Sequence, residues 1–187
     1  PEAMDVSKES KATLKLYGIQ PGQKTGFGWQ CLVGRRLAER GVRFIELIDV
    51  GSSNNWDAHG NMAPHAPLAK NVDQAIAGLI TDLKQRGMLD ETLVLFTTEF
   101  GRTPFAQSGR GTVGPGRDHN KGGFSIWAAG GGLKPGIAYG ATDEIGWRAS
   151  ENPVSWHDFH ATVLHLLGMN HENLTFYHNG IERRLTN

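Results

Sequence analysis

Apolar residues that recur every three or four positions predict several helices along the chain. The clearest pattern has the spacing of one helix face, with apolar residues at Leu68, Val72, Ile76, Leu79 and Leu83. Gly87 is expected to end this helix, because glycine readily adopts the backbone conformation that follows a helix. Similar patterns, each stopped by a glycine, predict helices over residues 7–17, 28–40 and 153–167, the last with Asn152 as cap and Pro153 at its first position.

Three stretches have the composition of β-strands. Residues 42–48 alternate partly and are rich in β-branched side chains, whereas residues 92–97 form the continuous apolar run of a strand buried on both faces. Residues 124–129 predict a third strand, and Asn179-Gly180 predicts a hairpin near the end. The order strand, helix, strand predicts a right-handed parallel crossover. We therefore expect an α/β fold that forms one continuous domain over residues 1–187.

Composition narrows the function classes. Lys and Arg number 19, as do Asp and Glu, and 39% of residues are apolar, which is typical of a folded globular protein and argues against a nucleic-acid binder. The one cysteine, Cys31, excludes an internal disulfide. No apolar run approaches the roughly 18 residues of a membrane span, and the first residues do not resemble a signal peptide.

Asp57 and His59 lie just after the first predicted strand, where open α/β sheets place their ligands. In an extended segment, residues two apart point to the same side. The carboxylate and the imidazole could therefore converge on one metal ion. The alternative is that Asp57 accepts hydrogen bonds from loop amides beside a solvated His59.

Glu99 follows the second predicted strand and opens a glycine-rich stretch, residues 99–123, that shows no hydrophobic period. Loops this long are usually functional. A carboxylate directly after an apolar strand needs a cation, which could be a metal ion or the nearby Arg102. Arg102 could equally hold a phosphate or sulfate oxygen.

Asp118 and His119 close the same loop and offer another carboxylate and imidazole, followed by Lys121. They precede the third predicted strand. If that strand is antiparallel to the one over residues 92–97, its amino end lies beside the carboxyl ends of the others. We therefore expect an antiparallel third strand, which brings His119 to Asp57 and Glu99.

Two other patterns are interpreted as structural. Residues 109–114 match the glycine spacing of a dinucleotide-binding loop, but they follow no strand and open no helix, so we interpret them as a flexible loop. His157 and His160 could share a helix face, but His160 lies on the apolar stripe and is interpreted as a core or interface histidine. The remaining histidines are expected at the surface, at His65, His165, His171 and His178.

Several motifs together resemble a known superfamily. Residues 89–101 resemble the strand and metal loop of sulfatases and alkaline phosphatases, and residues 158–168 resemble their downstream helix. More closely, four motifs in order resemble the sulfatase-like family known as domain of unknown function 1501. These motifs are Trp56-Asp57-x-His59, Glu99-Phe100-Gly101-Arg102-Thr103, Gly116-Arg117-Asp118-His119 and Gly140-Ala141-Thr142-Asp143.

The resemblance implies a three-layer α/β/α sandwich with a mostly parallel sheet and one antiparallel strand, of which this chain would be the carboxyl-terminal part. It implies a divalent metal, zinc or manganese, at Asp57, His59 and His119, with Asp118 as a further metal residue and Glu99 serving a second ion. Phe100 stands where alkaline phosphatases have a metal-binding histidine, which makes the second site poorer.

The function that the resemblance implies is hydrolysis of sulfate or phosphate esters, with Arg102 or Lys121 holding the anion. The substrate would be a small-molecule or polysaccharide ester, and the location periplasmic or extracellular in a bacterium. The nucleophile would come from a missing amino-terminal half, so we expect these 187 residues alone to be inactive. Two alternatives remain, a non-catalytic exported binding protein on the same fold and an autonomous zinc hydrolase.

Overall fold

The computed structural model describes residues 2–49, 56–109 and 112–186. The chain divides into two compact units, which are described separately below. Unit 1 comprises residues 1–92 and 105–118, and unit 2 comprises residues 93–104 and 119–187. The boundary therefore falls twice within the long glycine-rich stretch, once before residue 105 and once between Asp118 and His119.

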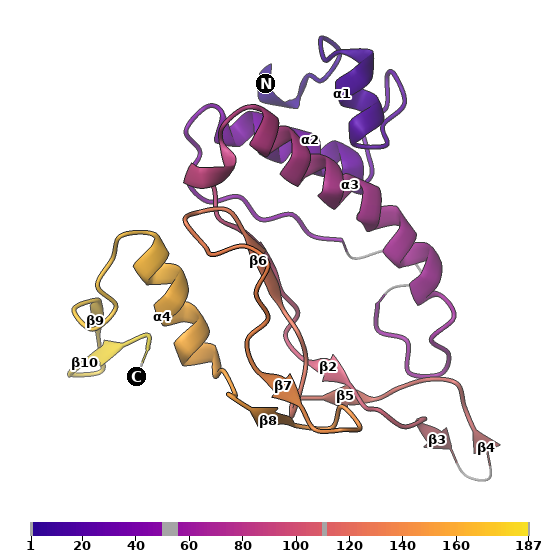
Figure 1. Ribbon diagram of the computed structural model, residues 1–187, viewed down its shortest axis with the longest axis vertical. Coiled ribbons are helices and arrows are strands. Elements are labelled where there is room, and N and C mark those ends of the chain that lie inside the picture. The colour runs from indigo at the N-terminus through magenta and orange to yellow at the C-terminus, as the bar shows by residue number, and fades with distance from the viewer. Residues whose placement is uncertain (1, 50–55, 110–111, 187) are drawn as a thin grey trace. The chain divides into compact units, whose positions relative to one another are not determined.

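Unit 1 is mainly helical, and α2 and α3 pack side by side in it (Figure 1). Its longest element is α3 (His65–Gln85), which contacts both α1 (Lys11–Leu16) and α2 (Phe27–Ala38). The remaining elements are two short 3-10 helices and one strand pair, namely η1 (Glu2–Met4), η2 (Leu89–Glu91), β3 (Ser108–Gly109) and β4 (Thr112–Val113).

The three α-helices of unit 1 enclose its hydrophobic core. Tyr17, Cys31 and Leu32 are almost fully buried in it. Gly78 lets α3 approach the end of α1, because a Cβ at this position would lie 2.6 Å from the carbonyl oxygen of Leu16. Burial raises the pKa of the Cys31 thiol to about 12, so this cysteine is an inert core residue.

A buried arginine joins these helices through charge. Arg35 on α2 is 2% exposed and forms ion pairs with Glu9 at 2.9 Å, Glu39 at 2.6 Å and Asp82 of α3 at 2.9 Å. The hydroxyl of Tyr17 donates a hydrogen bond to the same Asp82 carboxylate at 2.9 Å. Burial alone would raise the pKa of Glu9, but hydrogen bonds and charge from Arg36 and Arg35 outweigh it and lower the pKa. The charges in this cluster therefore stabilise one another.

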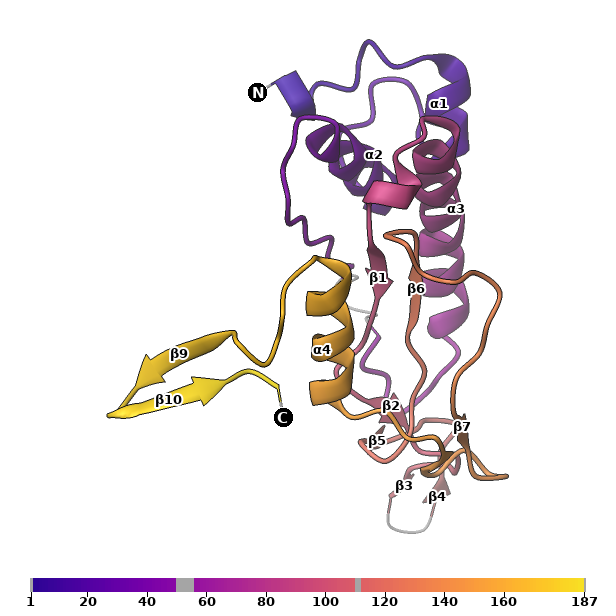
Figure 2. The same ribbon diagram turned by 60° about the vertical axis from the view of Figure 1, so that its left-hand side comes forward.

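Unit 2 consists of short antiparallel strand pairs and one helix. Its strands pair as β1 (Val94–Phe96) with β6 (Trp127–Ala129), β2 (Gly101–Arg102) with β5 (His119–Asn120), β7 (Ala141–Thr142) with β8 (Ala149–Glu151), and β9 (Thr175–His178) with β10 (Ile181–Arg184). The helix is α4 (Trp156–Leu166). Figure 2 shows the β9–β10 hairpin extending away from α4.

Much of the local structure agrees with the sequence. The four predicted helices are confirmed as α1, α2, α3 and α4, and the hairpin forms with Asn179 and Gly180 both at positive φ. The antiparallel third strand is also confirmed, since Val94, Leu95 and Phe96 pair with Ala129, Ala128 and Trp127. The polar stretch at residues 51–55 and residues 110–111 of the loop with dinucleotide-like glycine spacing lie outside the described residues.

The strand predicted over residues 42–48 is not formed. Its alternation nevertheless has a physical basis, because Ile45 and Leu47 face Gly34 of α2. A strand also needs a hydrogen-bonded neighbour, and none of the strand pairs of the described residues includes this segment. All of those pairs are antiparallel. The three-layer sandwich with a mostly parallel sheet, which the resemblance implies, therefore stays a prediction.

Three finer predictions were wrong in whole or in part. Leu95 and Phe96 are 36% and 37% exposed rather than buried on both faces, because a strand pair has too little around it to cover both sides. Asn152 has φ 42°, whereas a helix cap needs an extended backbone, and α4 is capped instead by Ser155 with Asp158 completing a capping box. His160 was interpreted as a core or interface histidine. It is exposed and stacks on Trp156, which excludes the core position, and the interface interpretation stays a prediction.

Within the described part of the chain, no helix combines the length and the apolar character needed to cross a membrane.

We expect Arg35→Ala to destabilise unit 1 strongly. The substitution removes the buried cation that faces both Glu9 and Asp82, and these carboxylates keep Arg36 and Arg86 as partners. Loss of one partner of a buried ion pair costs up to about 3–5 kcal/mol of folding free energy. Urea unfolding followed by helical circular dichroism would measure the loss. Arg40→Ala is the matched control, because Arg40 is an exposed arginine near the end of the same helix. Equal unfolding midpoints for the two variants would contradict this role of Arg35.

Candidate metal centre

Trp56 anchors the segment that carries Asp57 and His59. His65, the first residue of α3, makes a hydrogen bond through Nε2 to the Trp56 carbonyl at 2.7 Å, and the two rings lie 5.4 Å apart. The Trp56 indole also donates to Asp49 at 3.0 Å. Helix α3 therefore holds the residue that immediately precedes Asp57. His65, which the sequence left as an ordinary surface histidine, is a positioning residue.

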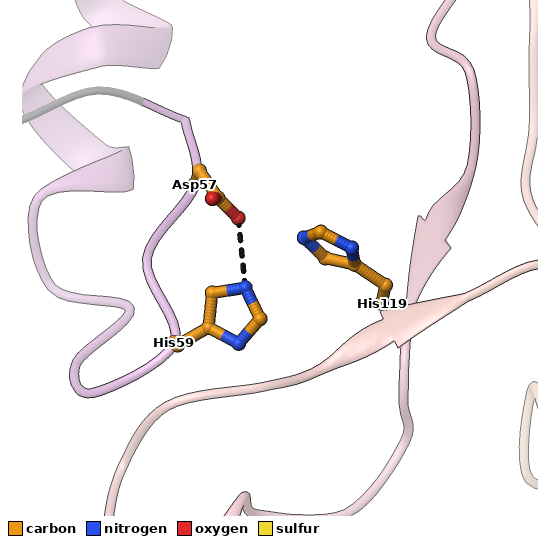
Figure 3. Close-up of side chains that lie close together, drawn as sticks. All are labelled: Asp57, His59 and His119. Atoms are coloured by element: carbon orange, nitrogen blue, oxygen red, sulfur yellow. Dashed lines mark ion pairs between the residues drawn. The ribbon is translucent and has the colours of Figure 1, made fainter.

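Asp57 and His59 point toward each other. The Asp57 Oδ1 atom lies 3.0 Å from the Nε2 atom of His59. A dashed line marks this pair in Figure 3. Two ligands at about 2.0–2.1 Å from a tetrahedral zinc ion lie roughly 3.3 Å apart. The separation is therefore close to that of two ligands of one ion. Both side chains reach solvent, with 55% of Asp57 and 35% of His59 exposed.

The other ring nitrogen of His59, Nδ1, also has partners. Its Nδ1 atom lies 2.8 Å from Gln107 Oε1 and 3.5 Å from Asp118 Oδ1. Because an amide oxygen only accepts, Nδ1 is the donor in the contact with Gln107, and Nε2 is the nitrogen that faces Asp57. Metal-binding histidines are commonly oriented by such an acceptor.

Sequence reasoning did not single out Gln107. A glutamine 48 residues from His59, in a loop without hydrophobic period, carries no signal that would mark it. Asp118 was predicted as a metal residue, and the structure places its carboxylate near the nitrogen of His59 that faces away from Asp57.

Gly116 fixes how the loop lies on this site. The Gln107 amide donates to the Gly116 carbonyl at 3.0 Å, which closes the base of the loop. A Cβ at position 116 would overlap the carbonyl oxygen of His59, so only glycine allows this approach. The close contact brings both Gln107 and Asp118 to the imidazole of His59.

His119 follows Asp118 directly in the chain. A trans peptide bond keeps their Cα atoms about 3.8 Å apart, so the backbone of His119 is tied to the end of unit 1. Asp57 and His59 of unit 1 and His119 of unit 2 each offer an atom of a kind that can ligate a metal ion. These are the three residues drawn in Figure 3.

Within unit 2, two neighbours accompany His119. Arg102 on β2 stands directly opposite His119 on β5, and directly opposed residues share a face of a strand pair. The ring of Phe100 packs on the imidazole with centroids 3.9 Å apart. Phe100 therefore orients the His119 ring. Position 100 is also where, by the resemblance described above, alkaline phosphatases have a metal-binding histidine.

The other predicted site residues lie at the surface. Glu99 is exposed and makes no hydrogen bond or ion pair with any described residue. Lys121 is also exposed.

His171, expected at the surface without a partner, is half-buried and bonded through Nδ1 to the Thr186 hydroxyl at 2.7 Å.

We expect Gly116→Ala to loosen the site by forcing the loop away from His59. Amide hydrogen exchange over residues 57–60 and 112–118 should become faster. Gly60→Ala is the matched control, since a Cβ there meets nothing within 4 Å. Unchanged exchange in Gly116→Ala would show that the close approach does not position the loop.

Comparison with known proteins gives a family match along the chain. The model of a family described as "Protein of unknown function (DUF1501)" matches residues 1–187. No curated protein and no solved structure matches the chain. Because the family match covers all 187 residues, the chain belongs to the family of unknown function DUF1501.

Proposed function

We propose that this protein is the metal-binding part of a metal-dependent hydrolase of sulfate or phosphate esters, related to sulfatases and alkaline phosphatases. The observation that carries the proposal is the 3.0 Å approach of Asp57 Oδ1 to His59 Nε2. The Gln107 contact with His59 Nδ1 supports it, since an oriented imidazole is what a metal ion requires.

The donor set favours zinc or manganese. Asp57 offers oxygen, and His59 and His119 offer imidazole nitrogen, whereas calcium prefers a shell made entirely of oxygen. We assign Asp118 to orienting His59, because its carboxylate lies on the Nδ1 side of the ring. Glu99 is kept as a carboxylate for a second ion, which would be weakly held because Phe100 supplies no ligand atom.

A bound divalent metal would polarise the ester and stabilise the charge that develops on its oxygens. The chain's own cations hold the anion. Arg102 is well suited to this, because its place opposite His119 puts a guanidinium beside a proposed ligand and its fork of donors matches a tetrahedral oxyanion. The nucleophile is proposed to lie outside these 187 residues.

The metal site predicts a specific loss of metal on mutation. Protein purified without chelator should contain zinc or manganese by elemental analysis. Asp57→Ala, His59→Ala and His119→Ala should each remove most of it, because three ligands leave no redundancy. Asp90→Ala and His157→Ala are matched controls that remove the same side-chain types elsewhere. Full metal retention in the three site variants would rule the site out.

The hydrolytic proposal predicts activity in the longest natural form of the protein. That form should hydrolyse chromogenic sulfate or phosphate esters, and Asp57→Ala should lower the rate by at least about 100-fold, since loss of metal removes several kcal/mol of stabilisation. The 187-residue chain alone should be inactive. Turnover by the short chain that Asp57→Ala abolishes would favour an autonomous zinc hydrolase. Metal binding without turnover in either form would favour a binding protein.

A further inference from the structure

Unit 2 contains a cavity of about 460 Å³, and its lining includes His119 together with residues that the proposed metal site does not use. Its volume lies within the range of roughly 300–1,000 Å³ that ligand sites occupy. The lining combines three rings, two cations and one amide, which belong to Phe100, His119, Trp147, Lys121, Arg148 and Asn120. All of them come from unit 2.

The two loops that form this cavity are tied together by a buried side chain. Asn120 is 4% exposed, its Nδ2 donates to the Trp147 carbonyl at 3.0 Å, and its Oδ1 accepts from the Gly122 amide at 2.9 Å. The Ala149 amide adds a bond to the Gly122 carbonyl at 2.7 Å. The segment that carries Asn120 and the segment that carries Trp147 are therefore held in a fixed relation.

Asp143 holds the loop that carries Trp147 and Arg148. Its carboxylate accepts hydrogen bonds from the Trp147 amide at 2.7 Å and the Arg148 amide at 3.2 Å. Both partners of the Asp143 carboxylate in these bonds are backbone amides. The Arg148 guanidinium is not engaged by them and remains available to the cavity.

The charge of the lining is positive. Neither the Lys121 ammonium nor the Arg148 guanidinium makes a hydrogen bond or ion pair with another described residue. Among the described residues that line the cavity, none carries a carboxylate. Two cations beside one cavity favour an anion, and both are donors that suit tetrahedral oxyanions.

We propose that this cavity binds a ring-bearing monoester of a tetrahedral oxyanion, with Lys121 and Arg148 on the anionic group and the Trp147 ring against the ring of the ligand. The volume suits one ring and its charged group. The proposal rests on the proposed ester hydrolysis and names its substrate class. Because His119 also lines the cavity, an ester bound there lies beside a proposed metal ligand.

The test measures ester binding in the absence of metal. Protein treated with chelator is titrated with phenyl phosphate and phenyl sulfate, and binding is followed by calorimetry. We expect Lys121→Met and Arg148→Met each to weaken binding at least about tenfold, as loss of a charge-assisted hydrogen bond does. Lys134→Met and Arg183→Met, which remove exposed cations that do not line the cavity, should bind as the parent does.

The role of Trp147 has its own comparison. Trp147→Ala should weaken phenyl phosphate binding while leaving inorganic phosphate unchanged, because inorganic phosphate has no ring to stack. Circular dichroism confirms that each variant is folded. Equal loss for the two ligands would overturn the ring contact.

The two proposals fail in different ways. If chelated protein binds neither phenyl ester, or if both methionine variants bind as the controls do, the cavity proposal is wrong even where Asp57 and His59 hold metal. If the esters bind through Lys121 and Arg148 but no metal is retained, the cavity stands and the metal site falls. Binding of one ester in preference to the other supports the cavity and identifies its oxyanion.

Discussion

The ion pairs of the buried Arg35 are the interaction on which the order of unit 1 depends. Arg35 on α2 is paired with Asp82 near the end of α3, so the two longest helices of the unit are fixed by charge as well as by apolar packing. A buried cation tolerates only a geometry in which its carboxylates stay in reach. This requirement sets where α3 lies, and the other end of α3 holds Trp56 through His65. The pairing in the core is thus connected, through one rigid helix, to the residue before Asp57.

The imidazole of His59 is constrained from two directions that are far apart in the sequence. Asp57 faces one nitrogen, and Gln107 holds the other through a loop that can approach only because residue 116 is glycine. An imidazole held in this way keeps its Nε2 atom in one direction, which would spare the proposed metal ion the cost of ordering the ring. The exposure of Asp57 does not weaken this argument, since an ion must still enter from solvent. The Asp57 and His59 pair is therefore ordered by contacts within unit 1 itself.

The sequence predicted what local patterns determine. The spacing of Leu68 to Leu83 and the turn at Asn179-Gly180 depend on neighbouring residues, so helix α3 and the last hairpin were predictable. The Asp57 and His59 pair was predictable because two residues in one extended segment share a side. Gln107 and Gly116 were not, because their roles arise from a contact across about 50 residues. Residues 42–48 show the same limit, since alternation reports which side packs on α2 but not whether a hydrogen-bonding neighbour exists.

The proposed chemistry divides between features that each unit builds by itself. Unit 1 forms the Asp57 and His59 pair with its Gln107 support, and unit 2 forms the cationic cavity through Asn120 and Asp143. His119 is linked to both, by a peptide bond to Asp118 and by its place in the cavity wall. A residue in that position can serve a metal ion and a bound ester at once only if its ring is held firmly. The Phe100 ring packed on it supplies that restraint within unit 2, which gives a physical reason for phenylalanine where the proposed resemblance to alkaline phosphatases would place a ligand.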